Sequence, residues 1–113
     1  MKKSDQVQNI FNDLYEILKN RKITNQPSSY THSLLKKGSG EICKKFGEEA
    51  IETVIAALSE KKHNVVNESA DVLYHLFVLW VHLGIELGDV ENELKRRFGT
   101  SGLVEKKNRR LLK

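Results

Sequence analysis

Hydrophobic side chains recur every three or four positions along most of this chain, which is the spacing of an amphipathic α-helix. The pattern predicts a first helix over about 4–22 and, after a polar connection, one or two helical turns over Tyr30–Lys37 that Gly38 closes. It also predicts a second long helix from about Ser39 to Glu60, apolar along one stripe and charged elsewhere. The stripe consists of Ile42, Phe46, Ala50, Val54 and Leu58.

A third long helix is predicted from about Asn64 to Leu83, and its second half, LYHLFVLWVHL, is apolar on nearly all sides. Such a helix needs two or more neighbours to cover it, which one chain of this size can hardly supply. A fourth, shorter helix should end at Gly99, before a basic tail over 99–113. We therefore predict an all-α fold, an antiparallel bundle of four main helices completed by homodimerisation.

Length and composition favour one domain with an anionic ligand. A chain of 113 residues, 39% of them hydrophobic, can bury one core, so 1–113 is expected to be a single domain. The net charge of +4 suits a nucleotide, a nucleic acid or a membrane surface without choosing among them. The single cysteine, Cys43, excludes an intramolecular disulfide and a multi-thiolate zinc site, favours a reducing cytoplasm, and is expected in the core.

Neither secretion nor membrane insertion is expected from the sequence. The basic N-terminus has no apolar stretch behind it. The longest apolar run, 76–81, falls far short of the ~20 residues that span a bilayer. A cytoplasmic protein is the expectation.

Carboxylates at helical spacing carry the candidate chemistry. Glu49 and Glu52 share a face of the second helix, Glu48 lies one turn before Glu52, and Glu68 shares a face of the third helix with Asp71. If the two helices pack antiparallel, the two sets can meet. The alternative is that they are solvated surface acids, but Asp71 stands at the head of the most apolar helix, where a partner or a metal is expected.

Converging carboxylates repel one another unless a cation lies between them. Oxygen-only ligands select a hard ion, so Mg²⁺ fits best and Mn²⁺ is a reasonable substitute. Such an ion shields phosphate charge and activates water, which is most of what hydrolysis of a phosphoanhydride requires. A di-iron site is disfavoured, because Ile55 and Asp71 occupy the positions where its Glu-x-x-His motifs would need histidine.

Several other residues are candidates for contacting substrate. Lys44 and Lys45 lie one turn before the acidic motif and could reach phosphates, although they could instead form salt bridges with it. Tyr30 could stack on a base or a ribose, or plug an edge of the core. Arg97 and Lys106 belong to a basic cluster that could close over a polyphosphate or remain a solvated tail. His75 is expected to be a hydrogen-bonded core histidine rather than a group that orients a carboxylate.

At these residues the chain resembles the phosphoribosyl-ATP pyrophosphohydrolase family, within the all-α NTP pyrophosphatase (MazG-like) superfamily. The superfamily motif, Glu-x-x-Glu followed by Glu-x-x-Asp, falls on Glu49, Glu52, Glu68 and Asp71, which the resemblance implies are the Mg²⁺ ligands. Glu48 would position the attacking water or hold a second ion, so that the catalytic set would be Glu48, Glu49 and Glu52. The particular family is indicated by four segments in order: SYTHSLLKKG, KKFGEEAIETVIAAL, NESADVLYHLFVLW and RRFGTSGLVEKKNRR.

The resemblance implies the second step of histidine biosynthesis, in which phosphoribosyl-ATP is hydrolysed to phosphoribosyl-AMP and pyrophosphate. The next enzyme, a phosphoribosyl-AMP cyclohydrolase, is expected to be a separate protein. The chain departs from the family pattern at His32 and Glu41, where alanine and lysine are expected. Two alternatives are a nucleoside triphosphate pyrophosphatase acting on dCTP or dUTP, and a non-catalytic helical module that binds nucleic acid through its basic tail. No nucleic acid or membrane partner is expected of the enzyme.

Overall fold

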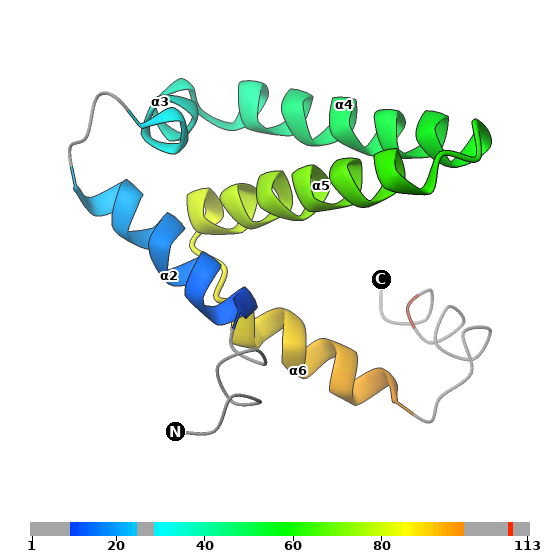
Figure 1. Ribbon diagram of the computed structural model, residues 1–113. Helices are drawn as coiled ribbons and strands as arrows, with labels where there is room; N and C mark the ends of the chain where they lie inside the picture. Colours follow the sequence, from blue (N-terminus) through cyan, green and yellow to red (C-terminus); the bar gives the residue numbers. More distant parts are fainter. Residues whose placement is uncertain (1–9, 25–28, 99–108, 110–113) are drawn as a thin grey trace.

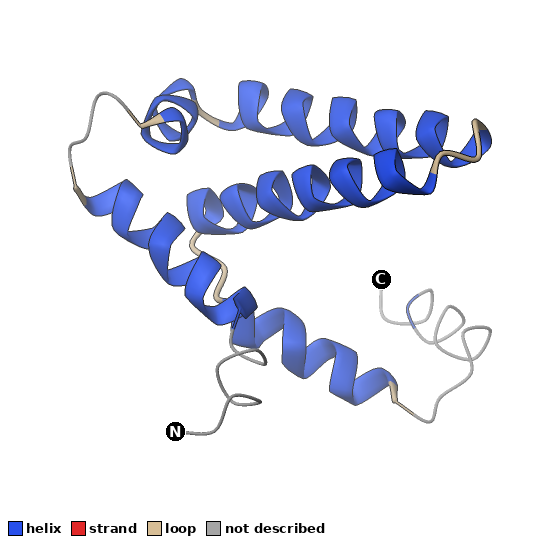
Figure 2. Ribbon diagram, viewed as in Figure 1, coloured by secondary structure: helices blue, strands red, loops and turns tan. Residues whose placement is uncertain are grey.

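The described part of the chain is entirely helical. The structure, a computed structural model, describes residues 10–24, 29–98 and 109. Five helices follow one another in this part, and it contains no strand (Figure 2). They are α2 (Ile10–Ile23), α3 (Tyr30–Lys37), α4 (Ser39–Leu58), α5 (Lys62–Leu83) and α6 (Leu87–Arg97). The predicted all-α class is therefore confirmed.

Local signals in the sequence set where several helices begin and end. Ser29 caps α3, its hydroxyl oxygen accepting a hydrogen bond from the backbone N–H of His32 at 3.2 Å. Gly38, at φ 88°, separates α3 from α4. Gly84 adopts the left-handed conformation, φ 76°, and its N–H closes the last turn of α5 onto the carbonyls of Trp80 and Val81. The start of the first helix, expected near residue 4, and the basic tail over 99–113 lie outside the described residues, Arg109 excepted.

The framework of the fold is an antiparallel hairpin of α4 and α5, the two longest helices (Figure 1). The helix α2 packs across the C-terminal half of α5, and α3 lies at the start of α4 against both α2 and α5. The core occupies this end of the hairpin. Its buried members are Tyr15, Leu18, Leu34, Ile42, Phe77, Val78, Val81 and Leu87.

Polar groups on α2 fasten this helix to the end of α5. The Tyr15 hydroxyl donates a hydrogen bond to the carbonyl of Ile85. The Lys22 ammonium donates to the carbonyl of Val81 at 3.0 Å. These two bonds therefore connect α2 to carbonyl groups at and just beyond the last turn of α5.

Burial is uneven along α4, and one expectation about it is wrong. The apolar stripe is buried only at its start, with Ile42 fully buried but Val54 56% and Leu58 79% exposed. Cys43, expected in the core, is exposed. The reason is the placement of α2 and α3, which cover the hairpin near the start of α4, so that among the described helices only α5 neighbours its far end.

The helix α6 departs from the hairpin in a different direction, as Figure 1 shows. It starts with a capping box, in which the Glu86 backbone N–H donates to the Asp89 carboxylate at 3.0 Å. Among the described residues, no single helix is long and apolar enough to cross a membrane. Only α5 and α6 taken together meet the length and composition criteria, and they are bent by 111° where they join.

Candidate active site

The antiparallel hairpin brings the two acidic motifs together. Glu49 projects from α4 toward α5, and Glu68 and Asp71 project from α5 toward α4. One carboxylate oxygen from each of these three residues lies within 4.8 Å of the other two. Spacing along each helix predicted which acids share a face, and the pairing of the helices places those faces opposite each other.

This cluster is electrostatically unfavourable without a counter-ion. Burial raises the pKa of Glu49 from 4.5 to about 7, with further contributions from Glu52, Asp71 and Glu68. Burial also raises the pKa of Glu68, again with help from Glu52 and Asp71. Oxygen Oε2 of Glu49 is buried and has no hydrogen-bond partner among the described residues. A buried acceptor of this kind, facing two other carboxylates, suits a hard divalent cation such as Mg²⁺.

Two further predicted acids lie at the margins of the cluster. Glu52 is close enough to Glu49 and Glu68 to raise the pKa of both, although it is not one of the three that converge most closely. Glu48 points elsewhere and forms an ion pair with Lys45, with 3.6 Å between Nζ and Oε1. The structure therefore groups Glu49, Glu68 and Asp71, places Glu52 beside them and leaves Glu48 outside.

The predicted basic contacts are not gathered at the carboxylates. Lys44 is exposed on α4, one turn before Glu48. Arg97 donates a hydrogen bond to Glu93 at 2.9 Å, and Arg96 also pairs with Glu93, so the two arginines lower the pKa of Glu93 to about 2. Since α6 runs away from the hairpin, the structure does not bring Arg97 to the acidic cluster of its own chain (Figure 1). Lys106 lies outside the described residues.

An aromatic group lies at the α3 end of the hairpin. The ring of Tyr30 is 54% exposed and stacks on Tyr74, with 6.2 Å between ring centroids. His75 is buried, as expected, and its Nδ1 is 2.8 Å from the carbonyl oxygen of Asp71. A carbonyl only accepts, so Nδ1 carries the proton, and in the neutral ring Nε2 accepts from the Tyr30 hydroxyl at 3.4 Å. This chain of contacts links the Tyr30 ring to the turn of α5 that carries Asp71.

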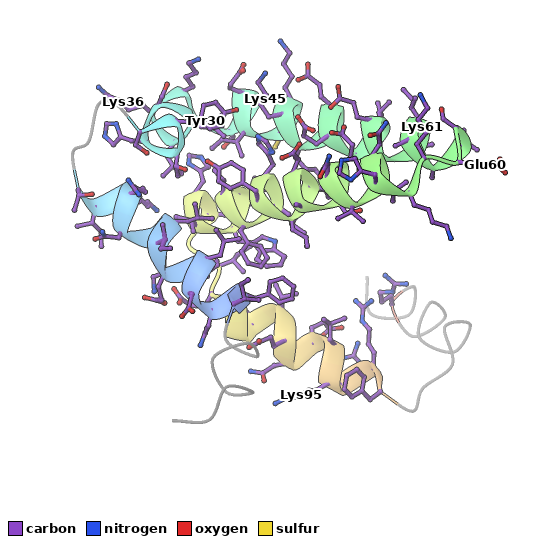
Figure 3. The ribbon with its side chains drawn as sticks, viewed as in Figure 1. Tyr30, Lys36, Lys45, Glu60, Lys61 and Lys95 are labelled. Carbon is purple, nitrogen blue, oxygen red and sulfur yellow. The ribbon has the colours of Figure 1, made fainter. Side chains whose placement is uncertain are left out.

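A cavity of about 440 Å³ lies at the opposite end of the hairpin, where α4 turns into α5. Its polar lining consists of Glu52, Ser59, Lys61, Asn64, Asn67 and Glu68. Glu52 and Glu68 belong to the acidic motifs, but the other four were not predicted as site residues. Polar residues at a helical turn are typical of any exposed turn, so no signal could have distinguished them. In Figure 3, Lys61 lies at this turn and Tyr30 near the other end of the hairpin.

Comparison with known proteins gives consistent matches over this region. A family model described as Phosphoribosyl-ATP pyrophosphohydrolase matches residues 11–98, which include both acidic motifs. The chain is 55% identical to the phosphoribosyl-ATP pyrophosphatase of Paramagnetospirillum magneticum over 100 residues, which cover 88% of this chain and 92% of that protein. It is 49% identical to the protein of that name from Geobacter sulfurreducens, over 88% of this chain and 93% of the relative. It is 48% identical to the phosphoribosyl-ATP pyrophosphatase of Rhodospirillum rubrum, over 89% of this chain and 86% of the relative.

Proposed function

The chain belongs to the phosphoribosyl-ATP pyrophosphohydrolase family and is a hydrolase of a phosphoanhydride bond, and from this premise we propose that its α4–α5 carboxylates carry out the reaction with Mg²⁺. The substrate is phosphoribosyl-ATP, and the products are phosphoribosyl-AMP and pyrophosphate, the second step of histidine biosynthesis. Mn²⁺ is the expected substitute for Mg²⁺, since both take oxygen ligands.

One observation carries the proposal: three carboxylates converge within 4.8 Å, and one of them holds a buried oxygen without a partner. Glu49, Glu68 and Asp71 would hold the ion. When bound, Mg²⁺ supplies positive charge that shields the phosphates and lowers the pKa of a coordinated water.

The carboxylates beside the ligands supply the remaining groups. Attack by water on the α-phosphorus forms a new P–O bond, breaks the bond to the bridging oxygen and releases pyrophosphate. Glu52 neighbours both Glu49 and Glu68, and we propose that it either completes the set of Mg²⁺ ligands or accepts a hydrogen bond from the attacking water. Glu48 is the other candidate for this role or for holding a second ion. Lys45, its ion-pair partner on α4, is the residue that we propose neutralises phosphate charge.

Substrate contacts come from several elements. The exposed Tyr30 ring can stack on the base or ribose, because it already lies flat against Tyr74 and loses little freedom on binding. Lys44 adds positive charge on α4. Arg97 and Lys106 would close over the phosphates. Arg97 would do so from a neighbouring copy of the chain, because α6 runs away from the carboxylates of its own chain (Figure 1).

Pyrophosphate release from phosphoribosyl-ATP tests the function, with and without Mg²⁺, alongside a panel of nucleoside triphosphates that includes dCTP and dUTP. We expect Mg²⁺-dependent release from phosphoribosyl-ATP, a rate at least about 100-fold lower for Glu52→Gln, and little activity on the triphosphates. Glu91→Gln, an exposed carboxylate on α6, is the matched control and should retain activity. Faster turnover of dCTP or dUTP would assign the chain to the nucleoside triphosphate branch instead.

A non-catalytic nucleic-acid-binding module gives a different result in the same set of experiments. It predicts salt-sensitive binding to nucleic acid that Glu52→Gln leaves unchanged, and no pyrophosphate release under any condition. We expect no such binding, no membrane association and a cytoplasmic protein. A separate cyclohydrolase would consume the product.

The dimer and its completed bundle also belong to this proposal. Large apolar side chains stand exposed at the far end of the hairpin: Ile51, Val54, Ile55, Leu58 and Val66. Several exposed large apolar side chains on two packed helices are typical of a protein interface. Sedimentation equilibrium should give twice the 13.0 kDa of one chain. Leu58→Lys should weaken the dimer. Ile23→Lys should not, because Ile23 is exposed on α2, away from this surface. A monomeric wild-type protein would refute the dimer.

A further inference from the structure

The cavity at the α4–α5 turn is continuous with the acidic cluster. Glu52 and Glu68 line its inner wall, and both lie beside Glu49 of the proposed metal site. Its volume of about 440 Å³ lies within the range of small-molecule sites. A molecule held at the carboxylates can therefore extend past Glu52 and Glu68 into this cavity.

The outer wall of the cavity presents hydrogen-bond donors and one positive charge. Lys61 contributes an ammonium group, while Asn64 and Asn67 contribute amides and Ser59 a hydroxyl. Lys61 also stands at the start of α5, whose first turn has no side-chain cap. The leading N–H groups of this 22-residue helix therefore reinforce the positive potential that Lys61 provides. Ile55 and Ala56 also line the cavity, so it is the ammonium, amide and hydroxyl groups of its lining that suit an anion.

The two ends of the hairpin differ in chemistry, and this difference orients the substrate. Tyr30 and Tyr74 form an aromatic surface at the α3 end, whereas the cavity at the turn end carries Lys61 and has no aromatic side chain in its lining (Figure 3). The bond that is cleaved must lie at the carboxylates between them. From this bond, the substrate extends one way as a nucleoside and the other way as two phosphates.

We propose that the cavity lined by Lys61, Asn64 and Asn67 binds the two terminal phosphates of the substrate and holds pyrophosphate after cleavage, while the nucleoside lies toward Tyr30. This proposal rests on the proposed function of the neighbouring carboxylates. The spacing along α5 agrees with it. Asn64 precedes Glu68 by one turn, an axial rise of about 6 Å, so that linked phosphates leaving the cluster reach the asparagine and then Lys61.

Direct binding of products tests the inference without relying on turnover. Titration calorimetry with Mg²⁺ measures the affinity for inorganic pyrophosphate and, separately, for AMP as the nucleoside half. The test variants are Lys61→Ala and Asn64→Ala, each with one polar group removed from an exposed position. The matched control is Lys62→Ala, since Lys62 is equally exposed but does not line the cavity. Thermal melting verifies that each variant folds.

We expect Lys61→Ala to weaken pyrophosphate binding about fivefold to tenfold and Asn64→Ala about threefold to tenfold, with AMP affinity unchanged. Lys62→Ala should change neither affinity by more than about twofold. Unchanged pyrophosphate affinity in both test variants would overturn the inference. A loss of AMP affinity in these variants would also overturn it, because it would place the nucleoside in the cavity. Absence of pyrophosphate binding to the wild-type protein at millimolar concentration would also overturn it.

Failure of the proposed function gives a different signature. In that case the wild-type protein would not release pyrophosphate from phosphoribosyl-ATP. Failure of the cavity assignment alone would leave hydrolysis intact, with equal pyrophosphate affinity in wild type and variants.

Discussion

Replacing Glu49 with glutamine should stabilise the metal-free protein while removing its response to Mg²⁺. In the folded chain, burial and three neighbouring carboxylates raise the pKa of Glu49 from 4.5 to about 7. Between these two pH values the folded chain binds more protons than the unfolded chain. The free energy of unfolding of the metal-free protein therefore falls as pH rises through this interval. Glutamine has nearly the same shape and carries no charge, so it removes this loss.

The size of the effect follows from the shift. If the whole shift affected stability, a change in the pKa of Glu49 from 4.5 to about 7 would lower the free energy of unfolding at high pH by about 3 kcal/mol. The cluster is partly open to solvent, and screening reduces this to about 1 to 2 kcal/mol. For a domain of this size, such a gain raises the melting temperature by about 4 to 8 °C. For comparison, Mg²⁺ at 100 times its dissociation constant adds about 2.7 kcal/mol to a wild-type protein that binds it only when folded.

The assay is thermal melting at pH 5 and pH 8, at one protein concentration, with EDTA or with Mg²⁺. In EDTA at pH 8, Glu49→Gln should melt above wild type, and at pH 5 the two should nearly coincide. Adding Mg²⁺ at pH 8 should raise the melting temperature of wild type but not of the variant. Glu91→Gln on α6 serves as the control and should follow wild type throughout. The reasoning is refuted if Glu49→Gln lowers stability at pH 8 in EDTA, or if Mg²⁺ stabilises both proteins equally.

Three further predictions concern the core, the backbone and the substrate. Ile42→Ala should lower the free energy of unfolding, measured by urea titration, by about 2 to 5 kcal/mol, because Ile42 is fully buried where the helices meet. A loss below about 1 kcal/mol would contradict this packing. Gly84→Ala should lower the free energy of unfolding by about 1 kcal/mol, because Gly84 has φ 76°. Gly88→Ala, at a helical position of α6 with open space around a new Cβ, should raise it by about 0.5 to 1 kcal/mol, and equal effects of the two substitutions would refute the conformational argument. Tyr30→Ala should raise KM for phosphoribosyl-ATP about fivefold or more with a smaller change in kcat, measured by pyrophosphate release, and an unchanged KM would remove Tyr30 from the substrate site.

The sequence determined the helices and the identity of the acidic motifs. Helical spacing of apolar residues predicted α3 with its end at Gly38, and placed α4, α5 and α6 within a few residues of their observed bounds. These features depend on neighbours three or four residues apart, so local chemistry is enough to reveal them. The same spacing placed Glu49 with Glu52 on one helix face and Glu68 with Asp71 on another, two sets that meet if the helices pack antiparallel.

Only the tertiary structure decided which of these acids converge and which apolar residues are covered. Spacing alone could not separate Glu49 from Glu48, since both are within reach of Glu52 along the helix, whereas packing against α5 buries Glu49 and leaves Glu48 paired with Lys45. Nor could it predict that Leu58 would be exposed, because burial depends on where α2 and α3 lie and not on the pattern within α4.

The cavity at the α4–α5 turn is the clearest case of what the sequence could not provide. Asn64 and Lys61 are ordinary turn residues along the chain, and they gain a role only because the antiparallel pairing of two helices sets them beside Glu52. A helical period relates residues on one helix, whereas a site formed between helices depends on how those helices are turned and aligned against each other.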